Sequence, residues 1–130
     1  MIKEFSDLVG KTIISIDGAE HNSEQIKIYC DDGSVYMMSH YQDCCENVDV
    51  EDVCGDIEDL LNTPILDARE ETSTHQPPPP SEYEPESYTW TFYILRTIKG
   101  SVTIRWYGSS NGYYSESVNF ELLNQALVQE

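Results

Sequence analysis

The sequence predicts an α+β fold in which antiparallel β-sheet dominates, with about six to seven strands in two meanders and one or two short helices. Apolar and polar residues alternate with a period of two in several segments, and turn pairs such as Asp-Gly and Lys-Gly separate those segments. A length of 130 residues suits one domain with a core and is too short for two. We therefore expect a single domain over residues 1–130.

In the first third of the chain, residues 3–9 are expected to form a short helical turn that ends at Gly10. Residues 11–17 are rich in isoleucine and close on an Asp-Gly pair, which predicts a strand. Residues 25–30 and 34–40 flank an Asp-Asp-Gly turn, which predicts a hairpin.

The middle of the chain is more polar. Residues 48–51 alternate valine with acidic residues and are expected to be extended. Asp56 stands at the start of a helical turn over residues 56–61, and a strand is expected over residues 65–69. Residues 70–87 hold four consecutive prolines and almost nothing apolar, which predicts an exposed, flexible Pro-rich insertion, either as a tolerated surface loop or as a ligand for proline recognition.

The C-terminal third carries the strongest strand signal, over residues 88–98. A Lys-Gly turn leads into a second strand over residues 101–107, which completes a second hairpin. Residues 113–122 predict a further strand, and residues 122–127 a short terminal helix.

Charge narrows the classes of partner. Seven basic against twenty-four acidic residues give a formal net charge of −17, which repels nucleic acid and anionic membrane and attracts cations and basic proteins. The same acidity could instead serve only solubility. No segment is long and apolar enough to span a membrane, and four cysteines with one adjacent pair are typical of reduced thiols. We expect a cytoplasmic protein that binds neither membrane nor nucleic acid directly.

Residues 40–61 concentrate the residue types that could carry chemistry. His40, Cys44, Cys45 and Cys54 are suitable zinc ligands, but their spacing is not that of a standard zinc site. The alternatives are a buried cysteine in the core and a strained Cys44–Cys45 disulfide. The acidic residues of this segment do not follow the calcium-loop pattern. No cofactor is therefore expected, and zinc is kept as the alternative.

Catalysis is not expected. A thiol nucleophile at Cys44 or Cys45 with His40 as base would need positive charge nearby, yet residues 28–68 contain no lysine or arginine. The sequence also lacks the glycine-rich nucleotide-binding motifs and the nucleophile elbow.

Recognition of another protein remains. The acidic segment could imitate a nucleic acid backbone, and tyrosines around the turn at residues 108–112 could form a second contact surface. The residues expected to contact the partner are Asp43, Glu46, Asp49, Glu51, Asp52, Asp56, Glu58, Asp59, Arg105, Tyr107, Tyr113 and Tyr114.

Two runs carry a family resemblance: Gln-Asp-Cys-Cys-Glu at residues 42–46, and Arg-Trp-Tyr-Gly at residues 105–108 followed by Gly-Tyr-Tyr at residues 112–114. They resemble a family of small uncharacterised proteins encoded mainly by bacteriophages and prophages. That resemblance implies no specific activity, and it does not extend to Cys54.

In a phage setting, small acidic proteins often bind and block host machinery. We therefore predict a non-catalytic protein that blocks a host protein with a basic surface, such as a defence nuclease, as an acidic nucleic-acid mimic. The alternative is a metal- or small-ligand-binding module that uses the His40, Cys44, Cys45 and Cys54 cluster or the turn from Tyr107 to Tyr114.

Overall fold

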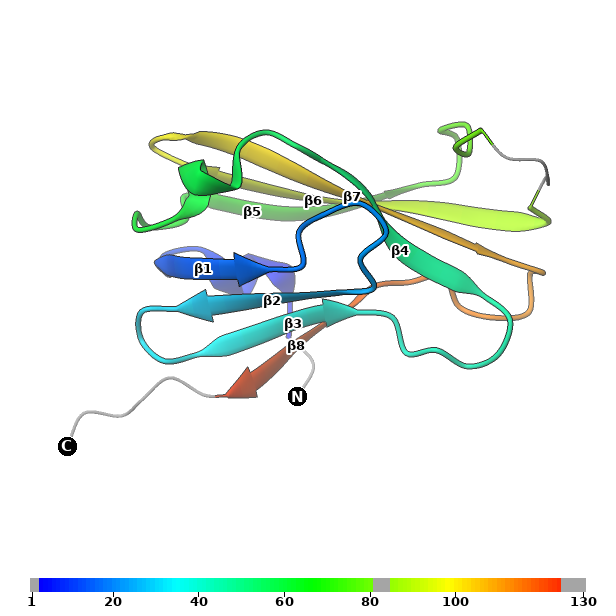
Figure 1. Cartoon of the computed structure of the whole chain (residues 1–130), viewed down its shortest axis with the longest axis horizontal. Coiled ribbons are helices and arrows are strands. Elements are labelled where there is room, and N and C mark those ends of the chain that lie inside the picture. The colour runs from blue at the N-terminus through cyan, green and yellow to red at the C-terminus, as the bar shows by residue number, and fades with distance from the viewer. Residues whose placement is uncertain (1–2, 81–84, 125–130) are drawn as a thin grey trace.

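Two four-stranded antiparallel sheets lie one against the other in the computed structural model, which describes residues 3–80 and 85–124 (Figure 1). The first sheet has the strand order β1-β2-β3-β8 and the second has the order β4-β7-β6-β5. The strands are β1 (Ile13–Asp17), β2 (Gln25–Cys30), β3 (Val35–Ser39), β4 (Asn47–Cys54), β5 (Asp67–Ser73), β6 (Ser87–Thr97), β7 (Gly100–Ser110) and β8 (Asn119–Asn124). The prediction of a mostly antiparallel sheet is confirmed.

Helical structure in the described residues is limited to two 3-10 turns, η1 (Phe5–Leu8) and η2 (Ile57–Leu60). Both fall where the sequence predicts a short helical segment. The Asp56 side chain caps η2, because its Oδ1 accepts a hydrogen bond of 3.0 Å from the backbone N–H of Glu58.

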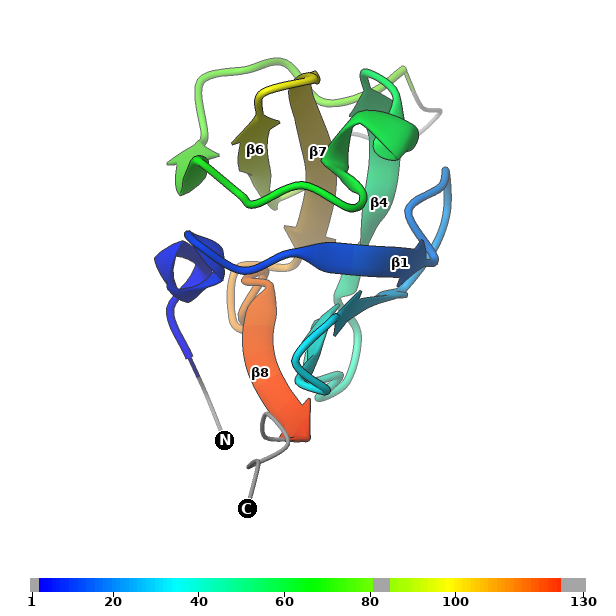
Figure 2. The ribbon, with the colours of Figure 1, turned by 90° about the vertical axis from the view of Figure 1, so that its left-hand side faces the viewer.

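The two hairpins form as predicted, and period-two alternation accounts for both. In β2 the side chains of Ile26, Ile28 and Cys30 are buried while Lys27 and Tyr29 are half-buried. The β6–β7 hairpin is longer, with eleven residue pairs in register from Ser87↔Ser110 to Thr97↔Gly100. After β7 the chain crosses to the other sheet, where β8 pairs with β3 (Figure 2).

The core lies between the sheets. Trp106, Tyr93 and Ile104 from the second sheet are fully buried, as are Ile28 and Met38 from the first. η1 closes one side, where the Phe5 ring lies 4.6 Å from the Tyr93 ring and 5.3 Å from the Phe120 ring. Such aromatic contacts add to the free energy of burial.

Several boundaries differ from the sequence prediction. β5 continues to Ser73, and β6 begins at Ser87, so the Pro-rich connection spans residues 74–86 instead of 70–87. β4 runs over eight residues instead of four, with a register shift between Val50 and Asp52. β8 begins at Asn119, so the strand predicted over residues 113–122 starts too early. β8 includes Leu122 and ends at Asn124, so the predicted helix over residues 122–127 is wrong at its start and otherwise lies outside the described residues.

The outer edge of β4 is partly covered by the loop between β1 and β2. The backbone N–H of Asn22 donates to the carbonyl of Val50 at 2.8 Å, and the Val50 N–H donates to the Ser23 carbonyl at 2.8 Å. His21 adds a 2.6 Å contact from Nδ1 to the Glu51 carbonyl. This loop therefore ties the first sheet to the edge of the second.

Within residues 3–80 and 85–124, no helix has the length and apolar character needed to cross a membrane.

Gly18 gives a direct test of this loop. Its φ is +87°, and a Cβ at this position would lie 2.1 Å from the Gln25 carbonyl oxygen. We expect Gly18→Ala to destabilise the protein by about 2 kcal/mol or more, because strain and a steric clash act together. Gly10→Ala is the matched control: its φ is +89°, but no heavy atom lies within 4 Å of the added Cβ. Urea denaturation should show a clearly larger loss for Gly18→Ala, and equal losses would contradict the clash.

Candidate functional site

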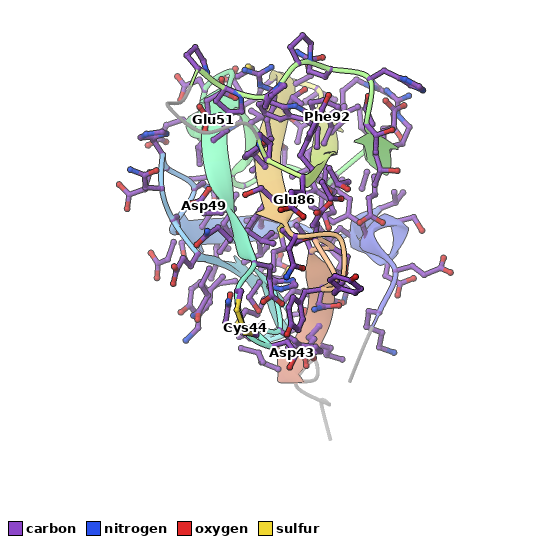
Figure 3. All side chains as sticks on the ribbon, turned by 90° about the vertical axis from the view of Figure 1, so that its right-hand side faces the viewer. Asp43, Cys44, Asp49, Glu51, Glu86 and Phe92 are labelled. Carbon is purple, nitrogen blue, oxygen red and sulfur yellow. A yellow bond between two sulfur atoms is a disulfide. The ribbon has the colours of Figure 1, made fainter. Side chains whose placement is uncertain are left out.

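The outer face of the second sheet brings together several of the predicted contact residues. β4 contributes Asp49 and Glu51, and β7 contributes Arg105 and Tyr107, with Asp49 opposite Tyr107 in register. Figure 3 shows Asp49 and Glu51 along one side of β4, with Asp43 beyond its start. The fold therefore brings these four predicted contact residues together on one face, while other predicted contact residues lie elsewhere.

A groove of about 400 Å³ lies on this face, which we call the acidic groove. Among the described residues that line it, two are carboxylates and none is basic. Its lining consists of Asn22, Asn47, Asp49, Glu51, Pro79, Pro85, Tyr107 and Ser109. The β1–β2 loop, β4, β7 and the Pro-rich connection each contribute to it, so the groove depends on tertiary structure.

The surroundings of Asp49 on balance disfavour its ionised form. Burial raises the pKa of Asp49, and repulsion from Glu51 and Glu24 raises it further. A cationic group in the groove would relieve both effects, since it would compensate the lost hydration and the repulsion between carboxylates.

The neighbouring Asp52 is already paired with a cationic side chain, that of Arg105. Arg105 donates from Nε to Oδ1 and from Nη2 to Oδ2 of Asp52, each at 2.5 Å. This fork lowers the pKa of Asp52. Arg105 also lies over the Trp90 ring, 5.2 Å from its centroid, so it is engaged within the face.

Aromatic side chains from β6 and β7 cover the rest of this surface, which we call the aromatic face: Tyr88, Trp90, Phe92 and Tyr107. The Tyr107 ring lies 5.0 Å from Trp90 and 6.1 Å from Tyr88. Tyr107 therefore borders both the aromatic face and the acidic groove.

The remaining acidic candidates lie at the other end of β4. Asp56, Glu58 and Asp59 belong to η2 and its cap, after Cys54 has ended the strand. The backbone carbonyl of Asp59 accepts a hydrogen bond from the Thr97 hydroxyl. These three residues form a separate acidic group.

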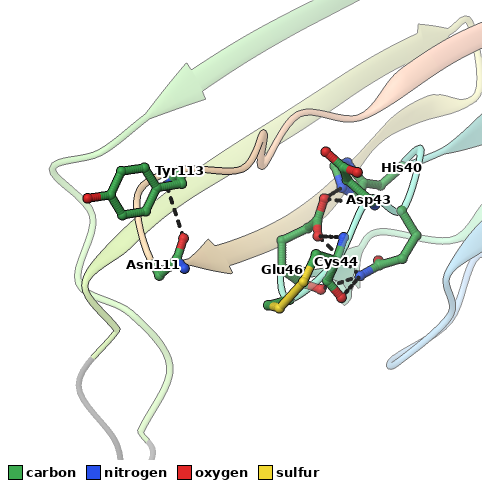
Figure 4. Close-up of a disulfide and its surroundings, with 8 residues drawn as sticks. His40, Asp43, Cys44, Glu46, Asn111 and Tyr113 are labelled. Carbon is green, nitrogen blue, oxygen red and sulfur yellow. Dashed lines mark hydrogen bonds and ion pairs between the residues drawn. A yellow bond between two sulfur atoms is a disulfide. The ribbon is translucent and has the colours of Figure 1, made fainter.

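Glu46 lies inside the loop before β4 and accepts hydrogen bonds from the backbone of that loop. Its side chain is fully buried, and its carboxylate accepts hydrogen bonds from the backbone N–H groups of Asp43 at 3.1 Å and Cys44 at 2.8 Å (Figure 4). The His40 ring lies 2.8 Å away through Nε2, and Gln42 donates at 3.3 Å. The His40 hydrogen bond, with the backbone donors, lowers the pKa of Glu46 to about 2 against the effect of burial.

His40 connects this loop to the segment after β7. Its Nδ1 lies 2.7 Å from the Ser117 carbonyl, and its Nε2 faces Glu46. The contacts of both nitrogens are with oxygen atoms and not with Cys44 or Cys45.

Cys44 and Cys45 are joined by a disulfide at the surface of the loop. Cys54 is exposed at the far end of the eight-residue strand β4, and Cys30 is buried in the core. The structure therefore does not bring the four predicted zinc candidates together. The described part of the chain contains no group of three or more histidine, cysteine or acidic residues placed to hold a metal ion.

The loop between β7 and β8 is built around a second buried carboxylate. Glu116 accepts hydrogen bonds from Thr89 at 2.8 Å and from Ser110 at 2.6 Å. Tyr113 projects from this loop with 89% of its surface exposed, while Tyr114 is half-buried. The predicted tyrosine patch is therefore divided, since Tyr107 belongs to the aromatic face.

A larger groove of about 550 Å³ lies between η1, β5 and β8. Its charges are partly compensated, because Arg69 lies 3.6 Å from Glu71 and the Tyr93 hydroxyl donates to Glu70 at 2.7 Å. Its lining includes the basic residues Lys3 and Arg69, whereas the described lining of the acidic groove includes none, so we regard the acidic groove as the stronger candidate.

Sequence reasoning missed Trp90, Glu116 and the contribution of Asn22. For Trp90 a signal existed: the alternation in residues 88–98 places it with Phe92 on one face, and a proline run precedes that strand. For Glu116 and Asn22 no local pattern marks the contacts, because both depend on segments distant in sequence.

The low pKa of Glu46 predicts a specific dependence on pH. The folded state releases this proton more readily (pKa about 2) than an ordinary carboxyl does (4.5), so acidification between these values favours unfolding. We expect Glu46→Gln to lower Tm by several degrees at neutral pH. The difference from wild type should shrink as pH falls from about 4.5 toward 2, measured by circular dichroism melts. Glu58→Gln, at an exposed site, is the control, and a pH-independent gap for Glu46→Gln would contradict the assignment.

The Cys44–Cys45 disulfide leads to two expectations: a specific pattern of cysteine alkylation, and only a small contribution of the bond to stability. A bond between adjacent residues closes almost no loop, so it contributes only about 1 kcal/mol through the unfolded chain. We expect iodoacetamide to modify Cys54 alone before reduction, and Cys44, Cys45 and Cys54 after reduction, with Cys30 protected until unfolding. Tm should change by less than about 5 °C on reduction. Mass spectrometry and thermal melts check both, and exposure of Cys30 on reduction would contradict the prediction.

A family model described as a domain of unknown function, DUF7448, matches residues 6–120. Searches of curated proteins and of solved structures returned no match for the chain. The matched region contains both loops with buried carboxylates, the acidic groove and the aromatic face. The chain therefore belongs to the DUF7448 family.

Proposed function

We propose that this protein is a non-catalytic, cytoplasmic binding protein. It binds to a basic surface of a host protein and thereby blocks that host protein. The observation that supports this most directly is the acidic groove, where Asp49 and Glu51 lie beside Tyr107 and no described lining residue is basic. Asp52, by contrast, is already paired with Arg105.

In this proposal a lysine or arginine side chain of the partner enters the groove. Its charged end would form charge-assisted hydrogen bonds with Asp49 and Glu51, and its stem would lie against the Tyr107 ring. The raised pKa of Asp49 supports this assignment, because a cation would return that carboxylate to its preferred ionised form.

The charge of the whole chain would speed the encounter. A formal net charge of −17 attracts a basic surface over distance and repels nucleic acid. A partner that normally holds a nucleic acid backbone has such a surface, so a defence nuclease fits this chemistry. The resemblance to phage-encoded proteins favours the same class of target.

The test is capture of a partner from bacterial lysate on the immobilised protein at low salt, followed by identification and measurement of its affinity. We expect the double variant Asp49→Asn/Glu51→Gln to bind at least about tenfold more weakly than wild type, since two charge-assisted contacts are lost. The control, Asp7→Asn/Asp31→Asn, makes the same change in net charge at exposed positions away from the groove and should bind nearly as wild type.

Affinity should also fall steeply with salt, and less steeply for the groove variant. Equal weakening by the two double variants would show that only net charge matters. A captured partner whose binding is insensitive to both salt and the groove variant would reject the proposal.

A further inference from the structure

Packing in the core between the sheets does not explain why Trp90 is buried. It is 3% exposed, yet it lies on the outer face of β6, opposite to the neighbouring core residues Tyr93 and Leu95. It does not belong to the hydrophobic cluster between the sheets. Another part of the chain must therefore cover it.

The Pro-rich connection supplies part of that cover, beside the Arg105 guanidinium, which lies 5.2 Å from the centroid of the Trp90 ring. The Trp90 indole Nε1 donates a hydrogen bond of 3.2 Å to the backbone carbonyl of Pro77. Pro78 and Pro79 are half-buried, and Pro79 lines the acidic groove with Tyr107. The connection, expected from sequence to be an exposed insertion, thus contacts the sheet through its prolines.

These contacts have the chemistry of polyproline recognition. Consecutive prolines favour the polyproline II helix, which has no internal hydrogen bonds and leaves its carbonyl groups free to accept. Aromatic surfaces bind such segments because the rings contact the pyrrolidines and a polar edge reaches a carbonyl. Trp90, Tyr107 and Tyr88 provide the rings, and the Trp90 indole provides the donor.

We propose that the aromatic face is a binding site for proline-rich peptide segments, which the chain's own residues Pro77–Pro79 occupy and which a proline-rich segment of a partner protein takes by displacing them. This inference goes beyond the proposed function: it rests on Trp90 and the prolines and not on the carboxylates, and the two surfaces share Tyr107 and Pro79 at their border.

Competition between the chain's own prolines and an added peptide determines the affinity that we expect to measure for the peptide. Residues 74–86 tether the prolines beside the face, which gives them an effective concentration in the millimolar range. A free peptide therefore binds the intact chain weakly, since its apparent affinity is the intrinsic affinity multiplied by the fraction of sites that the internal prolines leave free. Removal of the internal competitor should uncover the intrinsic affinity.

The experiment uses a variant in which Pro77, Pro78, Pro79 and Pro80 are all changed to serine. The probe is a capped peptide with the sequence of residues 74–80, Thr-His-Gln-Pro-Pro-Pro-Pro, and the control peptide carries serine in place of each proline. Nuclear magnetic resonance of the indole N–H groups gives the readout, with the fully buried Trp106 as internal reference.

We expect the Trp90 indole signal to shift in the proline variant and to return toward its wild-type position as the proline peptide is added, while Trp106 stays fixed. The variant should bind the peptide at least about tenfold more tightly than the intact chain does. Trp90→Phe in the same background should weaken binding about tenfold, because the indole donor and part of the contact area are lost. Isothermal titration calorimetry compares the two affinities, since this variant lacks the Trp90 indole signal.

The proposal is overturned if the Trp90 signal is unchanged by the proline substitutions, or if the folded variant binds the proline peptide no better than the serine peptide. A dimer of the wild-type chain in native mass spectrometry that the proline variant loses would assign the site to a second copy, and would also overturn it. If the variant does not fold, titration of the intact chain to millimolar peptide tests the same displacement at Trp90.

Discussion

The eleven-pair ladder between β6 and β7 is the interaction on which the rest of the structure depends. One face of this ribbon places Tyr93, Ile104 and Trp106 in the core. Its other face holds Trp90, Arg105 and Tyr107 for the candidate sites. Because side chains alternate strictly along paired strands, a shift of register by one residue would exchange the two sets. Folding and recognition therefore rely on the same backbone pairing.

Buried carboxylates organise the two loops at one end of this ribbon. Glu46 gathers the N–H groups of its own loop, and Glu116 gathers hydroxyl groups from β6 and β7. The contact between His40 and the Ser117 carbonyl links the two loops. A protein with so few basic residues thus uses backbone and hydroxyl donors, in addition to histidine, to stabilise buried negative charge.

The fold was largely predictable from sequence where one face of a strand is apolar and turns are marked by glycine, as in β2 and β3. It was less predictable where polar residues form an edge strand: Glu70 to Ser73 extend β5 through pairing with β6, although only Thr72 among them has a side chain that favours a strand. For residues 88–98 both faces carry aromatic or aliphatic residues, so alternation alone could not decide which face is the core.

The candidate site, like the fold, was predictable from sequence only in part. Acidity along β4 was evident from composition, and Asp49 and Glu51 lie in the groove. Composition could not separate Glu46, which is buried, from Asp52, which is paired with Arg105, because those differences arise from contacts between distant segments. The covering of Trp90 by prolines needed tertiary structure for the same reason.

The loop between β1 and β2, which bonds to Val50, also limits how molecules of this protein can associate with one another. An exposed edge strand is a template on which another chain can add as a further strand, and such growth leads to aggregates. At β4 a newcomer would first have to break two backbone hydrogen bonds. The strand that carries the groove can therefore present its side chains to a partner without also offering its backbone for uncontrolled self-assembly.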